Sequence, residues 1–354
     1  MGASPAGAAR RDPLPWYERG GMGEEVDVLG TINHMVPPIF LALCFLPPVH
    51  AALWFTSYFA LISYQRQTTW NPKRTYQPWL HIAVPLYVAA LPLCAVAESP
   101  LLVAALCWPG IVLKNGLMSV CLHRYSAHGA FRCGTWTNAF VCFLGCLANQ
   151  GGPIWWGSKH RCHHKFCDKE RDPHSPLMSG AINAFQFPFL KHNKRVDEEF
   201  RPMHCDSFPA RLLDTFAFAP VTFELLLAYV LGGPGGLWLS YTTGVLNQAG
   251  SLWFNVMNHP PQVLADGAQV CVAYDTTTWL PYDFALELSP NLLFRFFSVI
   301  ATTVSAITGE AAHEHHHDHT ALARRPGIDL PYHLLVRPLQ AAGLIWKVRL
   351  SSDA

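Results

Sequence analysis

Residues 80–128 of the chain read "LHIAVPLYVAALPLCAVAESPLLVAALCWPGIVLKNGLMSVCLHRYSAH". Two apolar segments, 80–96 and 100–122, lie on either side of a very short polar tip at 97–99. A helix needs about 20 mostly apolar residues to cross the hydrocarbon core of a bilayer. The stretch therefore predicts two transmembrane helices joined as a hairpin.

A second hairpin of the same kind follows, with arms at 212–231 and 237–258 joined by "GGPGG" at 232–236. The composition agrees with lipid contact, because 51% of the residues are hydrophobic and only 14% are charged. Ordinary soluble domains carry about 25% charged residues. We predict an all-α integral membrane protein with four transmembrane helices in two hairpins.

The basic residues are distributed unevenly around these helices. The tips 97–99 and 232–236 hold no Lys or Arg, whereas 123–210 holds eleven. The positive-inside rule places 123–210 in the cytoplasm or on the equivalent face of another membrane. Because the second hairpin also returns, we expect 259–354 on the same side, so that both segments form a helical cytoplasmic cap. The net charge of +1 argues against a general nucleic-acid binder.

The N-terminal part is harder to interpret. Residues 1–34 are rich in Gly, Ala and Pro, and we expect a mobile segment there, followed by a single membrane domain over 35–354. Residues 39–63 are apolar but interrupted by Pro47 and Pro48, which allows an extra spanning segment or a re-entrant one. The eleven cysteines form no CxxC pair, so we interpret them as reduced, structural thiols.

Most of the chemically informative residues are histidines on the predicted cytoplasmic face. Positions i, i+3 and i+4 of a helix share one side, so an HxxHH pattern can direct three imidazoles one way. His123 and His128 are five apart, or about 140° on an ideal helix, and converge only if the helix ends or distorts between them. Four groups emerge: His123 and His128; His160, His163 and His164; His259, one turn after Asn255; and His313, His316 and His317.

Neutral imidazole is a good ligand for iron, zinc or copper. Nine such groups are too many for one ion and suit two metals side by side, so we expect a dimetal site in the cap. The alternative for a run such as 313–319 is a solvated loop that binds stray metal weakly. His315 and His319 lie outside the HxxHH spacing. We interpret His174 as a loop residue and the remaining six as interfacial polar groups: His34, His50, His81, His192, His204 and His333.

These residues resemble the membrane-bound fatty acid desaturases, in particular the stearoyl-CoA, delta-9-type acyl desaturase branch. The resemblance covers about 80–349 and is carried by "HRYSAH", "HRCHHKF" with "DPH" after it, Asn-x-x-x-His, and Gly-Glu-x-x-His-x-x-His-His. It implies that all nine histidines bind two iron ions directly and that Asn255 holds a metal-bound water. It also implies that Trp156 lines a tunnel for the acyl chain.

The activity implied by this resemblance is O2-dependent introduction of a cis double bond into a long-chain acyl substrate. Its electrons would come from an external donor, either cytochrome b5 or ferredoxin with its reductase. The expected location is the endoplasmic reticulum, with a plastid or bacterial inner membrane as alternatives. Ser158 and Lys159 stand where acyl-CoA members have Arg and Asp, and "GGP" replaces their Asn-Asp, which leaves the acyl carrier open.

Two other functions fit parts of the pattern. A related diiron lipid hydroxylase or ketolase would use the same metal site. A His-rich protein that binds or transports metal would need polar groups inside its membrane helices. The predicted helices contain few of these, namely Lys114, Asp214, Glu224 and Asn247.

Overall fold

The computed structural model describes residues 100–169, 198–259 and 292–350 almost continuously. It also describes a few short pieces: residues 26–27, 48–49, 52, 171–173, 175, 192–193, 261–263, 269–271 and 273. The expectations for the 1–34 segment, for 39–63 and for the helix at 80–96 therefore lie essentially outside the described residues, as does His174.

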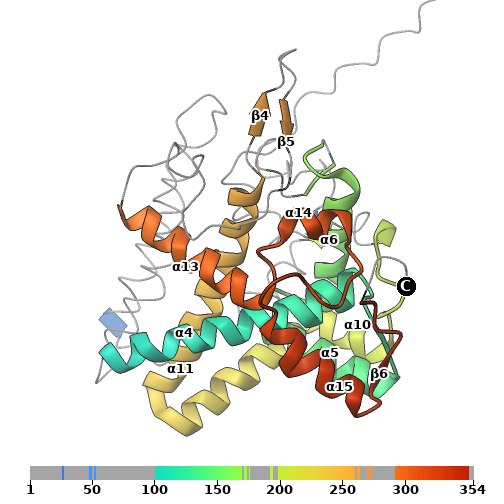
Figure 1. Ribbon diagram of the computed structural model, residues 1–354. Helices are drawn as coiled ribbons and strands as arrows, with labels where there is room; N and C mark the ends of the chain where they lie inside the picture. The colour runs from blue at the N-terminus through green and yellow to red at the C-terminus, as the bar shows by residue number, and fades with distance from the viewer. Residues whose placement is uncertain are drawn as a thin grey trace, which may run out of the picture.

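The described part is mostly helical (Figure 1). Its helices are α4 (Pro100–Leu117), the π-helix η1 (Met118–Ala127), α5 (Thr135–Cys146), α6 (Pro153–Phe166), α10 (Phe208–Thr215), α11 (Phe218–Asn258), α13 (Leu292–Thr308), α14 (His313–Asp318), the π-helix η3 (Tyr332–Val336) and α15 (Arg337–Ala341). Three antiparallel strand pairs complete it: β1 (Val26–Asp27) with β3 (His192–Asn193), β2 (Arg132–Cys133) with β6 (Ile345–Trp346), and β4 (Pro261–Val263) with β5 (Gln269–Cys271).

The helix predicted at 100–122 changes character halfway along its length. Its α4 part exposes Leu106 and Leu113, whereas every residue of η1 is buried. In a π-helix, hydrogen bonds join residues five apart, and the N–H of His128 donates to the carbonyl of His123 over 3.2 Å. The helix is thus distorted in the manner that the spacing of His123 and His128 requires.

The second predicted hairpin is present as the long, bent helix α11. The chain turns at Gly232 and Gly233, and Gly233 has φ of 59°, a left-handed conformation that glycine adopts easily (Figure 1). The predicted start at 212 is wrong, however, because α10 ends at Thr215 and α11 begins at Phe218. Phe216 leaves helical geometry there (φ −114°, ψ 43°), so that α10 packs against α5 and α6 instead of continuing α11.

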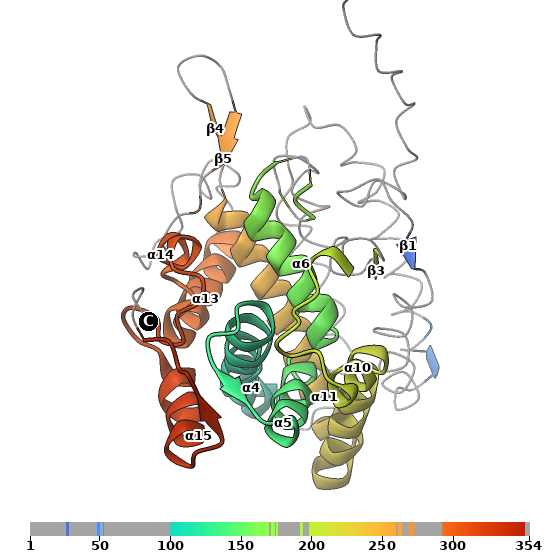
Figure 2. The ribbon, with the colours of Figure 1, turned by 90° about the vertical axis from the view of Figure 1, so that its right-hand side faces the viewer.

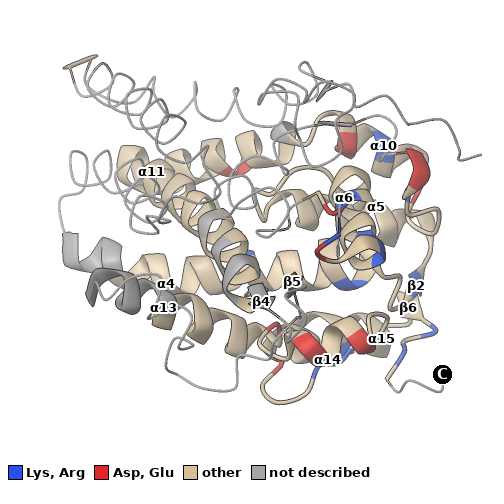
Figure 3. Cartoon of the chain, turned by 90° about the horizontal axis from the view of Figure 1, so that it is seen from above, with Lys and Arg blue, Asp and Glu red and all other residues tan. Residues whose placement is uncertain are grey.

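Two described segments are long and apolar enough to cross a membrane, Ala105–Ala127 and Ala219–Leu252. Bulky apolar side chains project outward from both, and Val230 and Leu231 are nearly 80% exposed (78% and 79%). Charged side chains gather instead around α6, α10, α14 and α15, and α4, α11 and α13 carry few (Figure 3). The apolar helices and the polar cap therefore occupy different parts of the described structure.

Polar groups inside the apolar helices bind one another. The ammonium group of Lys114 in α4 lies 2.7 Å from the Glu224 carboxylate in α11 and donates to the carbonyl of Leu147 over 2.9 Å. Asn115 donates to the side-chain oxygen of Asn247 over 3.1 Å, and Asn247 donates to the carbonyl of Ala148. These contacts fix α4 against both α11 and the end of α5.

Lys114→Met is expected to lower the thermal midpoint of the detergent-purified protein. It leaves the Glu224 carboxylate without its cation, which costs about 3 kcal/mol for a buried pair. We expect a loss of stability at the low end of the range for broken buried ion pairs, because the Glu224 side chain is 26% exposed. The double variant Lys114→Met/Glu224→Met should recover most of the loss. A double variant whose loss of stability equals the sum of the losses in the two single variants would contradict this account.

Candidate metal centre

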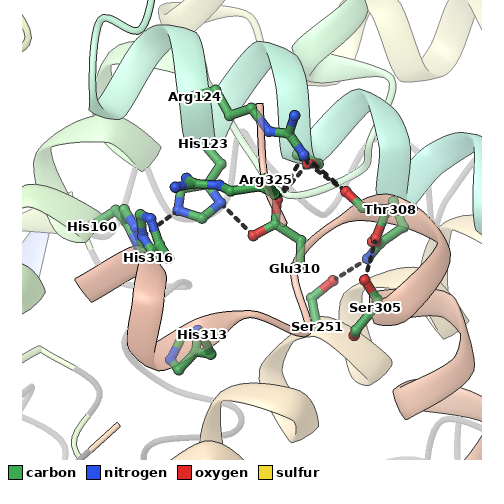
Figure 4. A network of polar contacts seen from close by, with 12 residues as sticks. His123, Arg124, His160, Ser251, Ser305, Thr308, Glu310, His313, His316 and Arg325 are labelled. Carbon is green, nitrogen blue, oxygen red and sulfur yellow. Dashed lines mark hydrogen bonds and ion pairs between the residues drawn. The ribbon is translucent and has the colours of Figure 1, made fainter. Parts of the chain in front are cut away.

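Four separate segments bring nine histidines together in the described structure: the end of η1, α6, the end of α11, and α14. The first group contains His123, His128, His160, His164 and His316, whose ligand nitrogens all lie within 4.8 Å of one another. Figure 4 shows His123, His160 and His316 directed toward one another from three different elements. All three were predicted from the sequence, where His123 lies in the first histidine motif, His160 in the second and His316 in the last.

The distances inside this group are short. The Nε2 atom of His316 lies 2.8 Å from Nε2 of His123 and 2.9 Å from Nε2 of His164. His164 Nε2 is in turn 2.9 Å from His160 Nε2. Two adjacent ligands on an octahedral ion with bonds of about 2.1 Å would be roughly 3 Å apart. The nitrogen spacing is therefore that of ligands around an ion.

The second group lies next to the first and contains His163, His259 and His317, together with the thiol of Cys167. His313 belongs with them, because its Nε2 atom is 2.9 Å from Nε2 of His259 and its ring centroid is 4.8 Å from that of His317. The Cys167 thiol approaches His259 at Nδ1, 3.8 Å away, which is the side of the ring opposite Nε2. The thiol also lies within 4.8 Å of a ring nitrogen of His163 and of His317.

Three carboxylates hold three of these imidazoles from behind. Glu310 lies 2.7 Å from Nδ1 of His123, Asp172 lies 2.8 Å from Nδ1 of His163, and Asp168 lies 2.9 Å from Nδ1 of His259. An ionised carboxylate only accepts hydrogen bonds, so each Nδ1 carries the proton and donates it. Each Nε2 then presents a lone pair to the group, the arrangement that metal-bound histidines usually show.

The sequence interpretation missed these carboxylates, although signals for two of them were present. Glu310 is the second residue of the Gly-Glu-x-x-His pattern, and Asp172 begins "DPH". Asp168 carries no such signal, since its role follows from its left-handed backbone (φ 57°) and from hydrogen bonds that form only in the folded chain. Its backbone N–H donates to Asp172 over 2.8 Å, and its own carboxylate accepts from Ser175 over 2.7 Å.

Burial favours the neutral form of most of these histidines. Desolvation, together with the charge of neighbouring histidines, lowers the pKa of His163 to about 3 and that of His317 to about 2. Burial likewise lowers the pKa of other members well below the ordinary value: His128, His160, His164, His313 and His316. The Nε2 atoms of His128 and His317 are buried and have no hydrogen-bond partner among the described residues. Buried ring nitrogens that converge without hydrogen-bond partners fit a pair of bound cations.

The N-terminus of α6 is held by an acid from another helix. Asp214 in α10 accepts the N–H groups of Ile154 and Trp155, each over 2.9 Å, and so caps the positive end of the α6 dipole. A Cβ at Gly152 would lie 2.2 Å from the Asp214 carboxylate oxygen, so only glycine admits this cap. Glycine at the "GGP" position therefore has a structural reason.

Trp156 and Asn255 occupy different surroundings. Trp156 is buried, donates its indole N–H to Gln150 over 3.1 Å, and stacks on His160 with 4.8 Å between ring centroids. Asn255 is half-buried in α11, one turn before His259. Ser158 and Lys159 are both buried, and the Ser158 hydroxyl donates to the carbonyl of Ile154 within its own helix.

The histidines that the spacing excluded lie outside both groups. His315 and His319 contact each other, with ring centroids 4.6 Å apart. His204 bonds the carbonyl of Tyr125, and His333 is exposed beside Arg337. Within 313–319, the HxxHH spacing therefore distinguished the three histidines that join the two groups from the two that do not.

Comparison with known proteins adds independent information. No protein-family model matches the chain. Delta-9 acyl-lipid desaturase 1 of Arabidopsis thaliana is 30% identical over 248 residues, which cover 67% of this chain and 72% of that protein. The chain belongs to the fatty acyl desaturase family.

Other desaturases match over similar lengths. The chloroplastic palmitoyl-monogalactosyldiacylglycerol delta-7 desaturase of Arabidopsis thaliana is 28% identical over 264 residues, 69% of this chain and 62% of that protein. The icosanoyl-CoA 5-desaturase of Limnanthes douglasii is 27% identical over 248 residues, 67% of this chain and 62% of that protein. The chain thus spans less than two thirds of the length of these two desaturases.

Asp172→Asn is expected to weaken metal binding by about 10- to 100-fold, because the amide no longer fixes the orientation and basicity of His163. Competition with a chelator measures this affinity. Asp318→Asn is the matched control, since Asp318 is an exposed aspartate directly after His317. Equal metal affinity in the two variants would contradict the role assigned to Asp172.

The metal-free protein is expected to lose stability on acidification from about pH 7.5 to about pH 5.5. Because burial lowers the histidine pKa values, the unfolded chain binds more protons than the folded chain below about pH 6.5. Each such histidine contributes at most about 1.4 kcal/mol per pH unit. His317→Gln should flatten the dependence of the thermal midpoint on pH, and His333→Gln should not. A midpoint that does not change over this range would contradict the buried, neutral state.

Proposed function

We propose that the protein is an O2-dependent acyl desaturase that introduces a cis double bond into a long-chain acyl substrate at a diiron centre. The observation that carries the proposal is the convergence of nine imidazoles in two adjacent groups, one around His316 and one around His317. Membership of the desaturase family supports the reaction class, and the names of its delta-9 relatives support the delta-9 type.

We propose as iron ligands all nine converging histidines: His123, His128, His160, His163, His164, His259, His313, His316 and His317. Asn255 would reach an ion through a water molecule. Bound iron would supply the redox chemistry, in which O2, two electrons and two protons take two hydrogens from neighbouring CH2 groups and yield two waters. The chain has to position the acyl carbons, exclude bulk water and keep its imidazoles fixed.

The described residues are suited to these tasks. His163, His259 and His316 are almost completely buried, which keeps bulk water away from the imidazoles. The carboxylates of Glu310, Asp168 and Asp172 hold three rings in one orientation, so little reorganisation is needed during the reaction. Trp156 presents an apolar face beside His160, where an acyl chain would pass, and this position supports its role as a tunnel residue.

The membrane arrangement belongs to the same proposal. We place 35–354 in one membrane domain with four spanning helices and the histidine groups in the cytoplasmic cap. The two apolar segments and their outward-facing side chains support two of those spans. With the ligands at the cytoplasmic face, electrons can reach them from a soluble or membrane-tethered donor, for which we propose cytochrome b5 or ferredoxin. The endoplasmic reticulum is the proposed location.

Metal transport has less support than oxidation chemistry. Lys114, Glu224 and Asn247 bind protein groups and hold helices together, and Asp214 caps α6. Their positions indicate structural roles and not an ion path. Hydroxylation uses the same centre, and the product distinguishes it, because a hydroxylase adds an oxygen atom where a desaturase removes two hydrogens.

Expression in a desaturase-deficient host, followed by mass analysis and double-bond mapping of total fatty acids, tests this function. The unaltered chain should produce acyl chains that lack two hydrogens. His163→Ala should abolish the product while still inserting into the membrane, because His163 is a central member of the second group. His315→Ala, in the same His-rich run but outside both groups, should retain activity.

Persistence of the product in His163→Ala would refute the ligand assignment. A product enriched in oxygen would identify the hydroxylase alternative. Purified protein that contains zinc alone, or no transition metal at stoichiometric level, would refute the diiron centre itself.

A further inference from the structure

Arg325 is a buried cation beside the first histidine group. It lies in the loop between α14 and η3, and its side chain is only 1% exposed. Figure 4 shows it alongside His123, near Glu310 and His316. Its charge reaches the histidines, since after burial it is the next largest cause that lowers the pKa of His316, and it also acts on His128.

The guanidinium group is incompletely bonded. One nitrogen, Nη1, donates to the carbonyl of His319 over 3.3 Å. The Nε and Nη2 donors are buried and have no acceptor among the described residues. The Nε of Arg124 also has no described acceptor, but both of its terminal nitrogens are bonded, to Asp329, Ser119 and two carbonyls. Buried donors almost always have an acceptor, so those of Arg325 indicate an anionic or polar group beside the histidines.

The two histidine groups also differ in their surrounding charge. Near the first group, the positive charges of Arg124 and Arg325 offset the negative charges of Glu310 and Asp329. Next to the second group, Asp168 and Asp172 accept hydrogen bonds from His259, Ser175 and His163. The carboxylates near the first group are thus paired with arginines, and those next to the second group with histidines.

We propose that Arg325 and the first histidine group together bind one small inorganic anion, such as hydroxide or azide, which completes the ligand set of the ion at that group. This inference rests on the proposed diiron centre. The unbonded donors would hold the anion, and the offset carboxylates leave the positive charge that attracts it. The second group, with two carboxylates behind its rings, would not bind an anion in the same way.

Azide titration of the oxidised, iron-loaded protein tests the proposal. Binding is measured by the charge-transfer absorption of azide on iron. The unaltered protein should bind one azide for each pair of irons. Arg325→Gln should weaken azide binding by roughly 10- to 100-fold, the usual loss for a hydrogen bond to a charged group. Arg325→Lys, which keeps the charge without the forked donors, should show an intermediate loss. Arg324→Gln is the matched control, because Arg324 is the exposed neighbour, and its azide affinity should not change.

Iron content separates this proposal from the function on which it rests. Protein that does not bind two irons contradicts the diiron centre. Two irons with an azide affinity in Arg325→Gln equal to that of the unaltered protein contradict the anion site alone. If Arg325→Gln loses iron, the number of azide ions that the unaltered protein binds tests the proposal instead. Binding of two azides per iron pair, or of none, would overturn it.

Discussion

The structure depends on holding nine imidazoles close together and directed at common points, six of them buried and three half-buried. Burial favours the neutral form, as the lowered pKa of His163 indicates, but it does not orient a ring. The orientation comes from the carboxylates of Glu310, Asp168 and Asp172, which fix the proton on Nδ1 and leave the Nε2 lone pair facing inward. The surrounding helices have to hold these acids as accurately as the histidines themselves.

The apolar helices contribute to that accuracy through a continuous set of polar contacts. Asn115 in α4 accepts from the Thr308 hydroxyl over 2.7 Å, and the Thr308 carbonyl accepts from Arg124 over 2.9 Å. Ser119 and Arg124 then contact Glu310. Figure 4 shows this acid bonded to His123. Seen from the side, α4 lies between α13 on one flank and α6 on the other (Figure 2). A shift of α4 against α13 would therefore be transmitted to a proposed iron ligand.

The sequence was sufficient to predict the helical class and to select the nine histidines, because those predictions rest on local spacing and composition. The sequence showed that His123 and His128 converge only if the helix is distorted between them. It did not show that the distortion occurs, because the packing of the surrounding helices determines whether a π-helix forms. The break at Phe216 was missed because apolar composition continues through it. Asp168 could not be found either, because its position depends on a turn and on partners distant in sequence. Local patterns specify which residues can meet, and tertiary contacts decide how they are held.

The departure from the desaturase pattern at "GGP" has the same explanation. The N-terminus of α6 has unsatisfied N–H groups wherever the chain starts the helix, so an acceptor must be supplied. Here Asp214 supplies it from α10, and Gly152 leaves the space for its carboxylate. Because α6 carries Trp156 and three of the nine histidines, this cap fixes against α10 the start of the helix that holds them. A polar residue that composition alone would assign to a membrane helix thus belongs to the support of the metal centre.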